Sequence, residues 1–165
     1  MDNLVAYEKQ LKLHIVAVVA VIRNQEGKYL VLKRRDDEVA YPGMYTFPGG
    51  KVEGNDSIEE TLVKEALEEA SLKLKPGKML LKDKSFIRPD GQTVKSLSYL
   101  SEAEEPMDVK ISSDFTDYKW ISREDLKTIP HVGIEEELRL ANELYVSGSP
   151  LEIFGTKSEK IEKQL

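Results

Sequence analysis

The stretch from Gly49 to Leu72, GGKVEGNDSIEETLVKEALEEASL, decides the fold, because a glycine turn leads directly into a well-marked helix. Pro48 and the glycines after it predict a turn, or a backbone that another group approaches closely. Ser57 with Glu60 three residues later is the pattern of a capping box, so we expect the helix to begin there. Apolar residues then recur at helical spacing, which predicts a helix with one face toward a core. These residues are Ile58, Leu62, Val63, Ala66, Leu67 and Ala70.

Acidic residues on this helix lie where ordinary packing does not favour them. Glu65, Glu68 and Glu69 are neighbours at helical spacing, and like charges so placed cost about 0.2–0.5 kcal/mol per pair in an isolated helix. Glu69 also projects inside the apolar face, where a carboxylate needs a partner or a cation. Mg²⁺ is the simplest cation, since carboxylates and substrate phosphates usually hold it. The alternative is a solvated helix face, because Glu60, Lys64 and Glu68 alternate in charge.

The same stretch resembles the signature of the Nudix hydrolases. That signature places a glycine, a glutamate, an Arg-Glu pair and a Glu-Glu pair at fixed spacings, and it ends on a glycine and an apolar residue. Gly50 and Leu72 open and close the resemblance here. The acidic residues Glu65, Glu68 and Glu69 match it residue by residue.

Departures from the signature concern three positions. Asp56 stands where the family usually has Glu, Lys64 where it has Arg, and Ser71 where it has Gly. The first two keep the charge, but lysine lacks the planar fork of donors with which arginine orients carboxylates, so the rate is more in question than the chemistry. Ser71 affects the end of the helix, where glycine would relieve a left-handed residue.

The resemblance implies a site for Mg²⁺, with Mn²⁺ as the alternative ion. Glu68 and Glu69 would bind the metal together with the backbone carbonyl of Gly49. Glu65 would be a further metal ligand or the general base, and Lys64 would orient the carboxylates. Clustering raises the pKa of at least one carboxylate, which suits a general base.

A further acidic residue is expected from a loop ahead of the strand that holds Trp120. In the family such a residue often joins the catalytic group, and Asp114 is the candidate here, with Asp117 as the alternative. Either residue can equally be an ordinary loop aspartate. Glu53, in the loop before the helix, is a further candidate to approach the metal.

Residues expected to contact substrate lie before the glycine turn. Lys33, Arg34 and Arg35 end a predicted strand, where they can meet phosphates, although a charged strand end is often only solvated. Tyr45 and Phe47 can stack on a nucleobase, although alternating aromatic residues on a strand usually belong to a core.

Composition indicates an ordinary single-domain protein without metal–thiolate chemistry. The chain has 165 residues and a net charge of −6, so it can bury a core but lacks the basic surface that duplex nucleic acid requires. It contains no cysteine, which excludes disulfides, zinc–thiolate sites and thiol nucleophiles. The N-terminus lacks a signal-peptide pattern, and the apolar run Leu13–Ile22 is too short to span a membrane. We therefore expect a cytoplasmic protein.

The remaining pattern predicts strands around the helix and a second helix. Leu11–Arg23 and Lys28–Arg35 read as strands joined in a hairpin, and Gly133–Tyr145 reads as an amphipathic helix. Met79–Ile87 and Thr93–Leu100 read as strands joined by a turn, and Tyr118–Ile121 as a further short strand.

These elements predict an α+β fold with a mixed β-sheet between helices. The resemblance implies the same arrangement, the Nudix-type α/β/α sandwich, over about residues 13–146. We expect one hydrolase domain over residues 1–154 and a polar tail over residues 155–165.

The leading functional hypothesis is Mg²⁺-dependent hydrolysis of a phosphoanhydride in a nucleoside diphosphate-linked substrate. A nucleoside triphosphate cleaved to monophosphate and pyrophosphate is the preferred case, and ADP-ribose or a nucleotide sugar is the alternative. A nucleotide-binding module with weak turnover is a different class, which the departures from the signature suggest. A protein-interaction domain with a solvated acidic helix is a third. The expected partner is a small nucleotide, with no nucleic acid polymer and no membrane, and a homodimer is one option for the assembly.

Overall fold

The computed structural model describes residues 13–88, 90–146 and 148–151. The predicted tail over residues 155–165 and the start of the predicted strand at Leu11 lie outside the described residues. Among those that are described, no helix is long and apolar enough to cross a membrane. In chain order the elements are β1 (Ile15–Ile22), β2 (Tyr29–Arg34), β3 (Tyr45–Thr46), β4 (Gly49–Lys51), α2 (Ile58–Ala70), β5 (Met79–Ile87), β6 (Thr93–Ser101), β7 (Phe115–Ile121), the short 3₁₀ helix η1 (Glu124–Lys127) and α3 (Glu135–Leu144).

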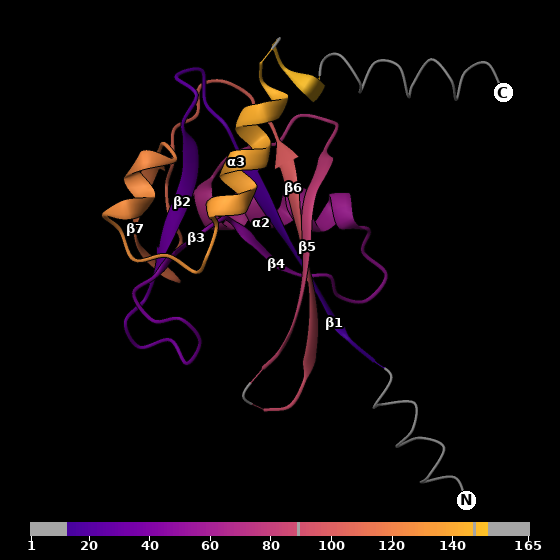
Figure 1. The fold of residues 1–165 in the computed structure, drawn as a ribbon. Coiled ribbons are helices and arrows are strands. Elements are labelled where there is room, and N and C mark those ends of the chain that lie inside the picture. The colour runs from indigo at the N-terminus through magenta and orange to yellow at the C-terminus, as the bar shows by residue number, and fades with distance from the viewer. Residues whose placement is uncertain (1–12, 89, 147, 152–165) are drawn as a thin grey trace, which may run out of the picture.

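The strands of the described chain form a four-stranded and a three-stranded sheet, ordered β4-β1-β6-β5 and β3-β2-β7. Strand β1 pairs in parallel with β6 and antiparallel with β4, so the larger sheet is mixed. Helices α2 and α3 lie on opposite sides of the strands (Figure 1). The predicted α+β fold with a mixed sheet between helices is therefore confirmed.

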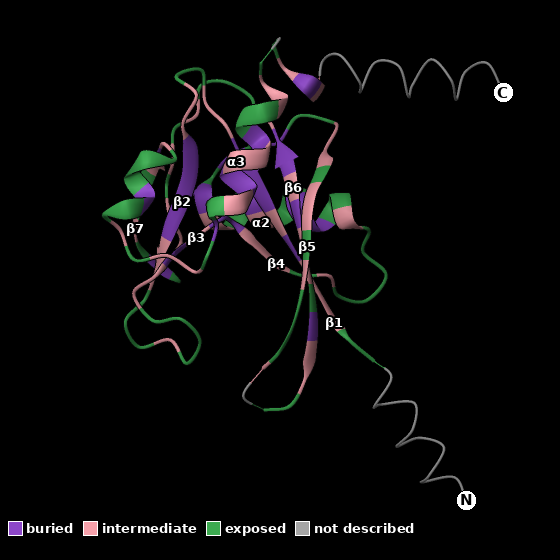
Figure 2. Cartoon of the chain, in the orientation of Figure 1, coloured by how far each residue is buried: buried purple, intermediate pink, exposed green. Residues whose placement is uncertain are grey.

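Strand β1 is apolar along its length because both of its faces are covered. Val18 and Ile22 pack in the core beneath α2, together with Leu62 of that helix. Val21 packs on the opposite side with Leu138 of α3, and the buried layers on both sides are visible in Figure 2. Successive side chains of a strand point to opposite faces of the sheet. A strand between two helical layers therefore needs apolar residues on both faces.

Strands β1 and β2, which were predicted to pair as a hairpin, belong to different sheets. A tight turn does connect the strands, since the Asn24 amide donates to the Lys28 carbonyl at 2.9 Å and Arg23 forms a single bridge with Tyr29. Beyond that bridge β2 pairs with β3 and β7 instead. The hairpin prediction is wrong because β4 and β6 already occupy the two edges of β1.

Helix α2 begins and ends as its sequence indicates. The Glu60 amide donates to the Ser57 hydroxyl at 3.0 Å, and the Ser57 amide donates to the Glu60 carboxylate at 2.8 Å, which confirms the capping box. Ser71 ends the helix in the left-handed conformation with a φ of 58°. Its hydroxyl donates to the Lys110 carbonyl at 3.0 Å, a contact that glycine cannot make.

The buried face of α2 is narrower than predicted. Leu62, Ala66 and Ala70 are buried against the strands. Val63 and Leu67, which the spacing also assigned to that face, are exposed, and Leu67 keeps 55% of its surface. The helix therefore contacts the strands along a strip, and the acidic residues lie beside that strip.

The later strands follow the prediction more closely. Strands β5 and β6 form the expected antiparallel hairpin, in which the Arg88 amide donates to the Gln92 carbonyl at 2.9 Å and Gly91 takes a φ of 83°. Strand β7 starts at Phe115, earlier than the predicted Tyr118.

Candidate active site

Gly49 and Gly50 lie in strand β4 instead of the predicted turn, and they fit between β1 and the acidic helix because they have no side chains. Strand β4 pairs with β1 so that Gly49 lies opposite Val19. A Cβ on Gly49 would lie 2.2 Å from the Val18 carbonyl oxygen, and a Cβ on Gly50 would lie 2.5 Å from Glu65 Oε1. The predicted close approach is thus confirmed, and its partners are β1 on one side and a glutamate of α2 on the other.

Glu69 is the most strongly perturbed carboxylate beside these two glycines. It is half-buried, and its Oε2 accepts a hydrogen bond from the Gly49 amide at 2.8 Å. Burial raises the pKa of Glu69 to about 8, against the opposing effect of the Gly49 hydrogen bond and with help from the negative charges of Glu65 and Asp114. Glu69 can therefore carry a proton near neutral pH.

Glu65 shares this environment. Burial raises its pKa first, and the negative charge of Glu68 adds to the effect, while the positive charge of Lys64 opposes it. Glu68 and Lys64 themselves are exposed on α2. The helix therefore presents a partly buried pair, Glu65 and Glu69, with Glu68 at its solvent edge.

Asp114 lies near this pair and Asp117 does not. The charge of Asp114 raises the pKa of both Glu65 and Glu69, and its loop is tied to the end of α2 by the Ser112 amide, which donates to the Glu69 carbonyl at 3.1 Å. Asp117 instead accepts a hydrogen bond from the Tyr45 hydroxyl at 2.5 Å. Of the two aspartates, the structure brings Asp114 to the glutamates.

Positive residues at the end of β2 face different directions. Arg34 lines the cavity beside Glu69, and its charge opposes the rise in the Glu69 pKa. Arg35 forms an exposed ion pair with Asp37 at 2.8 Å. The hydrogen bond to Asp37 and the negative charge of Asp37 raise the pKa of the Arg35 guanidinium, and the negative charge of Asp114 adds to this effect. Lys33 lies on the other face of β2, opposite Tyr45 in the strand register.

The sequence contains a signal for the position of Arg34. Leu30 and Leu32 lie four and two residues before Arg34, on the same face of β2, and both pack in the core beneath α2. Alternation along the strand therefore directs Arg34 to the side of the acidic helix and Lys33 to the opposite side.

The aromatic residues predicted to stack on a base are both buried. Tyr45 is 4% exposed and Phe47 is 3% exposed, and both pack in the core beneath α3. Burial and the hydrogen bond to Asp117 raise the pKa of the Tyr45 hydroxyl. Phe47 also lines the cavity that contains Gly49 and Glu69, whereas Tyr45 does not contribute to it.

A cavity of about 510 Å³ connects the acidic helix with the opposite layer of the fold. It includes Glu69 of α2 and Glu137 of α3, which lie on opposite sides of the strands. Its volume is within the range of small-molecule sites, roughly 300–1,000 Å³. The lining also includes Val18, Val19, Arg34, Phe47, Gly49, Gly50, Lys84, Ser98, Val132 and Ile134.

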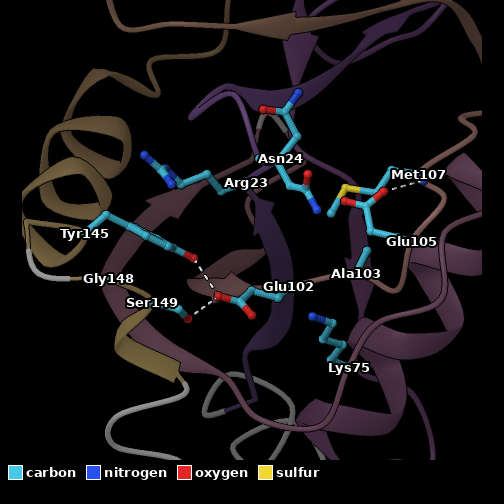
Figure 3. A pocket seen from close by; sticks show the side chains of 11 residues that line it. Arg23, Asn24, Lys75, Glu102, Ala103, Glu105, Met107, Tyr145, Gly148 and Ser149 are labelled. Carbon is cyan, nitrogen blue, oxygen red and sulfur yellow. Dashed lines mark hydrogen bonds between the residues drawn. The ribbon is translucent and has the colours of Figure 1, made fainter.

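A second cavity of about 310 Å³ contains none of the predicted site residues. The Tyr145 hydroxyl donates to Glu102 Oε1 at 3.0 Å, and the Ser149 hydroxyl is bonded to the same oxygen (Figure 3). The Arg23 guanidinium lies 4.0 Å from the centre of the Tyr145 ring. Because Glu102 is already paired and Gly49 and Gly50 do not line this cavity, we place the chemistry in the larger cavity.

Comparison with known proteins identifies the family. Residues 13–140 match the model of the NUDIX domain. A nucleoside triphosphatase NudI of Klebsiella pneumoniae (strain 342) is 32% identical over 118 residues, which cover 67% of this chain and 84% of that protein. A nucleoside triphosphatase NudI of Escherichia coli O81 (strain ED1a) is 29% identical over 123 residues, covering 66% of this chain and 83% of that protein.

The solved structures agree with this fold. The crystal structure of a MutT protein from Methanosarcina mazei Go1 has a TM-score of 0.67 and 26% identity, and it covers 80% of this chain and 96% of that one. Since the domain model spans most of the sequence, the chain belongs to the Nudix family and is a pyrophosphohydrolase. The resemblance of its helix to the Nudix signature is thereby confirmed.

Proposed function

We propose that this enzyme hydrolyses a nucleoside triphosphate to the monophosphate and pyrophosphate, with Mg²⁺ bound at the acidic helix and Mn²⁺ as the alternative ion. The observation that carries the proposal is the half-buried Glu69 held against the Gly49 amide at 2.8 Å, at one end of a ligand-sized cavity. The similarity to proteins named nucleoside triphosphatases supports the choice of substrate.

The oxygen ligands beside the glycines of β4 fit a hard divalent cation. In this proposal the Gly49 carbonyl, Glu65, Glu68 and Glu69 hold the ion, and all of them offer oxygen ligands, which Mg²⁺ prefers. Within the described residues, no three His, Cys, Asp or Glu side chains already converge as a metal site. Glu68 is exposed, so its side chain can turn toward the pair at small cost. Bound Mg²⁺ would offset the charge that develops on the phosphoryl oxygens.

The residues of the chain then have separate tasks. The Gly49 amide fixes the position of the Glu69 carboxylate. Glu65 or Glu68 accepts a proton from the attacking water, with Asp114 as a further base candidate, while Lys64 orients the carboxylates. As the water oxygen forms its bond to phosphorus, the bond to the bridging oxygen breaks and pyrophosphate leaves with that electron pair. Positive charge from Arg34 lies beside the same carboxylates, where phosphates would arrive.

Other predicted substrate contacts are less direct. Phe47 lines the cavity and can contact a bound ligand there. Arg35 is paired with Asp37 but exposed, so it can exchange that partner for a phosphate. Lys33 and Tyr45 face the α3 side of β2 and β3, and we propose no contact with phosphate for them.

The experiment that tests the proposal is release of phosphate and pyrophosphate from a substrate panel, with and without Mg²⁺. The panel contains nucleoside triphosphates, ADP-ribose, nucleotide sugars and dinucleoside polyphosphates. We expect Mg²⁺-dependent pyrophosphate from a nucleoside triphosphate. Turnover confined to ADP-ribose or a nucleotide sugar would refute the assignment of a nucleoside triphosphate as substrate. Binding without any product would favour the nucleotide-binding module. Cytoplasmic location and homodimer formation stay predictions from the sequence.

A further inference from the structure

Glu137 of α3 is a buried carboxylate that the proposed hydrolysis does not use. It is 1% exposed and lines the same cavity as Glu69 and Gly49. Its Oε1 contacts the Lys84 ammonium at 2.7 Å and accepts a hydrogen bond from the Ser98 hydroxyl at 3.2 Å. Its Oε2 is buried and has no hydrogen-bond partner among the described residues.

The fold alone does not account for this carboxylate. Glu137 lies on the face of α3 that Ile134, Leu138 and Ala141 bury, where an apolar side chain would pack without a charge. A buried charge is costly unless it is fully paired, and a buried acceptor without a donor adds to that cost. Lys84 pairs with one oxygen only, and its ammonium also donates to the Gly133 carbonyl at 2.7 Å. A donor for Oε2 therefore has to come from elsewhere.

The cavity offers a route for such a donor. It extends from the acidic helix on one side of the strands to Glu137 on the other, and Val19, Phe47 and Ile134 contribute apolar wall between them. A ligand whose phosphates lie at α2 would place its other end near Glu137. In a nucleotide that end is a planar base, which suits an apolar wall and carries N–H groups at its edge.

We propose that Glu137 selects the nucleobase of the substrate. Its Oε2 accepts a hydrogen bond from an amino or imino N–H of the base, while Lys84 and Ser98 hold the carboxylate in position through Oε1. This inference rests on the proposed function, because it takes the phosphates to lie at the acidic helix. It assigns Glu137 to specificity and gives it no part in the hydrolytic step.

Glu137→Gln tests the inference sharply because its partners fix the amide orientation. The Lys84 ammonium can only donate, so the amide oxygen takes the Oε1 position, where the Ser98 hydroxyl can also donate to it, and the amide nitrogen takes the place of Oε2. The substitution thus changes an acceptor into a donor with little change in shape. Two comparisons between bases with opposite hydrogen-bond patterns should report that reversal. They are cytosine compared with uracil, and adenine compared with hypoxanthine.

The measurement is calorimetric titration with α,β-imido analogues of the cytidine, uridine, adenosine and inosine triphosphates in Mg²⁺. We expect the wild type to discriminate within at least one pair by about tenfold, the effect of one hydrogen bond at ~1.4 kcal/mol. In Glu137→Gln that ratio should change by about tenfold or more, while affinity for the α,β-imido analogue of ribose 5-triphosphate, which lacks a base, stays within about twofold. Glu135→Gln, an exposed neighbour on the same helix, is the control and should keep the wild-type ratio.

Ratios within one variant cancel differences in folded fraction, so the outcomes are distinct. Wild-type protein that binds the analogues without preference, or a Glu137→Gln variant that keeps the wild-type ratio, would overturn the inference and leave the proposed function standing if turnover persists. Wild-type protein that binds none of the analogues would overturn both. If Glu137→Gln does not fold, Glu137→Met removes the acceptor at similar length, and discrimination retained in that variant would refute the role of Glu137.

Discussion

The raised pKa of Glu69 predicts an unusual dependence of stability on pH in metal-free protein. The pKa of this carboxyl is 4.5 in its ordinary state and about 8 in the folded chain, so the folded state binds the proton more tightly than the unfolded state. The stabilisation is present in full below about pH 4.5 and is lost as the pH rises through about 8. Metal-free protein should therefore become less stable across this range, where ordinary paired carboxylates would not cause such a loss.

The size of the effect follows from the shift. Each unit of pKa corresponds to about 1.4 kcal/mol, so a shift of about 3.5 units sets an upper limit near 5 kcal/mol. Glu65 titrates in the same environment, which spreads the loss over a wider pH range. A change of 1 kcal/mol moves the melting temperature of a chain this long by about 2–4 °C. Between pH 5 and pH 8 the linkage releases about 3.5 kcal/mol of this limit, so we expect a fall of several degrees, and at most about 14 °C.

The assay is thermal unfolding in EDTA at a series of pH values, with Glu69→Gln as the comparison. Gln cannot ionise, so the variant should lose less stability than the wild type over the same range and should be the more stable protein at pH 8. Glu59→Gln, on the same helix but exposed, is the control and should follow the wild type. Parallel curves for the wild type and Glu69→Gln would refute the assignment of a buried, protonated carboxyl at this site.

Further predictions concern Gly50 of β4, the helix cap and the positive residues of β2. Gly50→Ala places a Cβ 2.5 Å from Glu65 Oε1, so kcat should fall by about tenfold or more while the melting temperature changes little, and unchanged kcat would contradict this contact. Ser57→Ala removes the hydroxyl that caps α2, which should cost about 1 kcal/mol in chemical denaturation, and a loss below about 0.3 kcal/mol would contradict the role of the cap. Arg34→Ala should raise KM for the nucleotide several-fold, whereas Lys33→Ala should not. Equal effects of the two substitutions in steady-state kinetics would contradict the placement of Arg34 and Lys33 on opposite faces of β2.

Local signals in the sequence were sufficient for the helix and its acidic residues. The capping box at Ser57 and Glu60 depends only on neighbouring residues, and it forms as predicted. The close packing around Gly50 could also be predicted in kind, because glycine favours close approach. Its partner Glu65 became visible only in the structure.

Features that depend on competition between distant segments could not be predicted in this way. The turn at Asn24 resembles a hairpin, but β6, far away in the chain, takes the edge of β1 that β2 would need. The exposure of Leu67 likewise depends on where the strands lie beneath α2. Local periodicity contains neither fact.

Glu137 was missed because it stands in a run of acidic residues at the start of α3, which reads as a solvated helix face. The spacing from Ile134 to Leu138 and Ala141 does place position 137 on the buried face, so a signal was present. Its cationic partner Lys84 comes from β5, far away in sequence, and only the fold brings the two together. Asp114 became distinguishable from Asp117 for the same reason, because Tyr45 binds the latter.

The most direct test of the acidic-helix site is the rate of nucleoside triphosphate hydrolysis in Glu68→Gln and Glu69→Gln, measured by pyrophosphate release at saturating Mg²⁺. Circular dichroism and thermal unfolding establish that each variant is folded, and Glu59→Gln serves as the matched control. The account predicts that kcat falls by about 100-fold or more in both site variants and stays near the wild-type value in the control. Full activity in both site variants would contradict the placement of the chemistry on this helix.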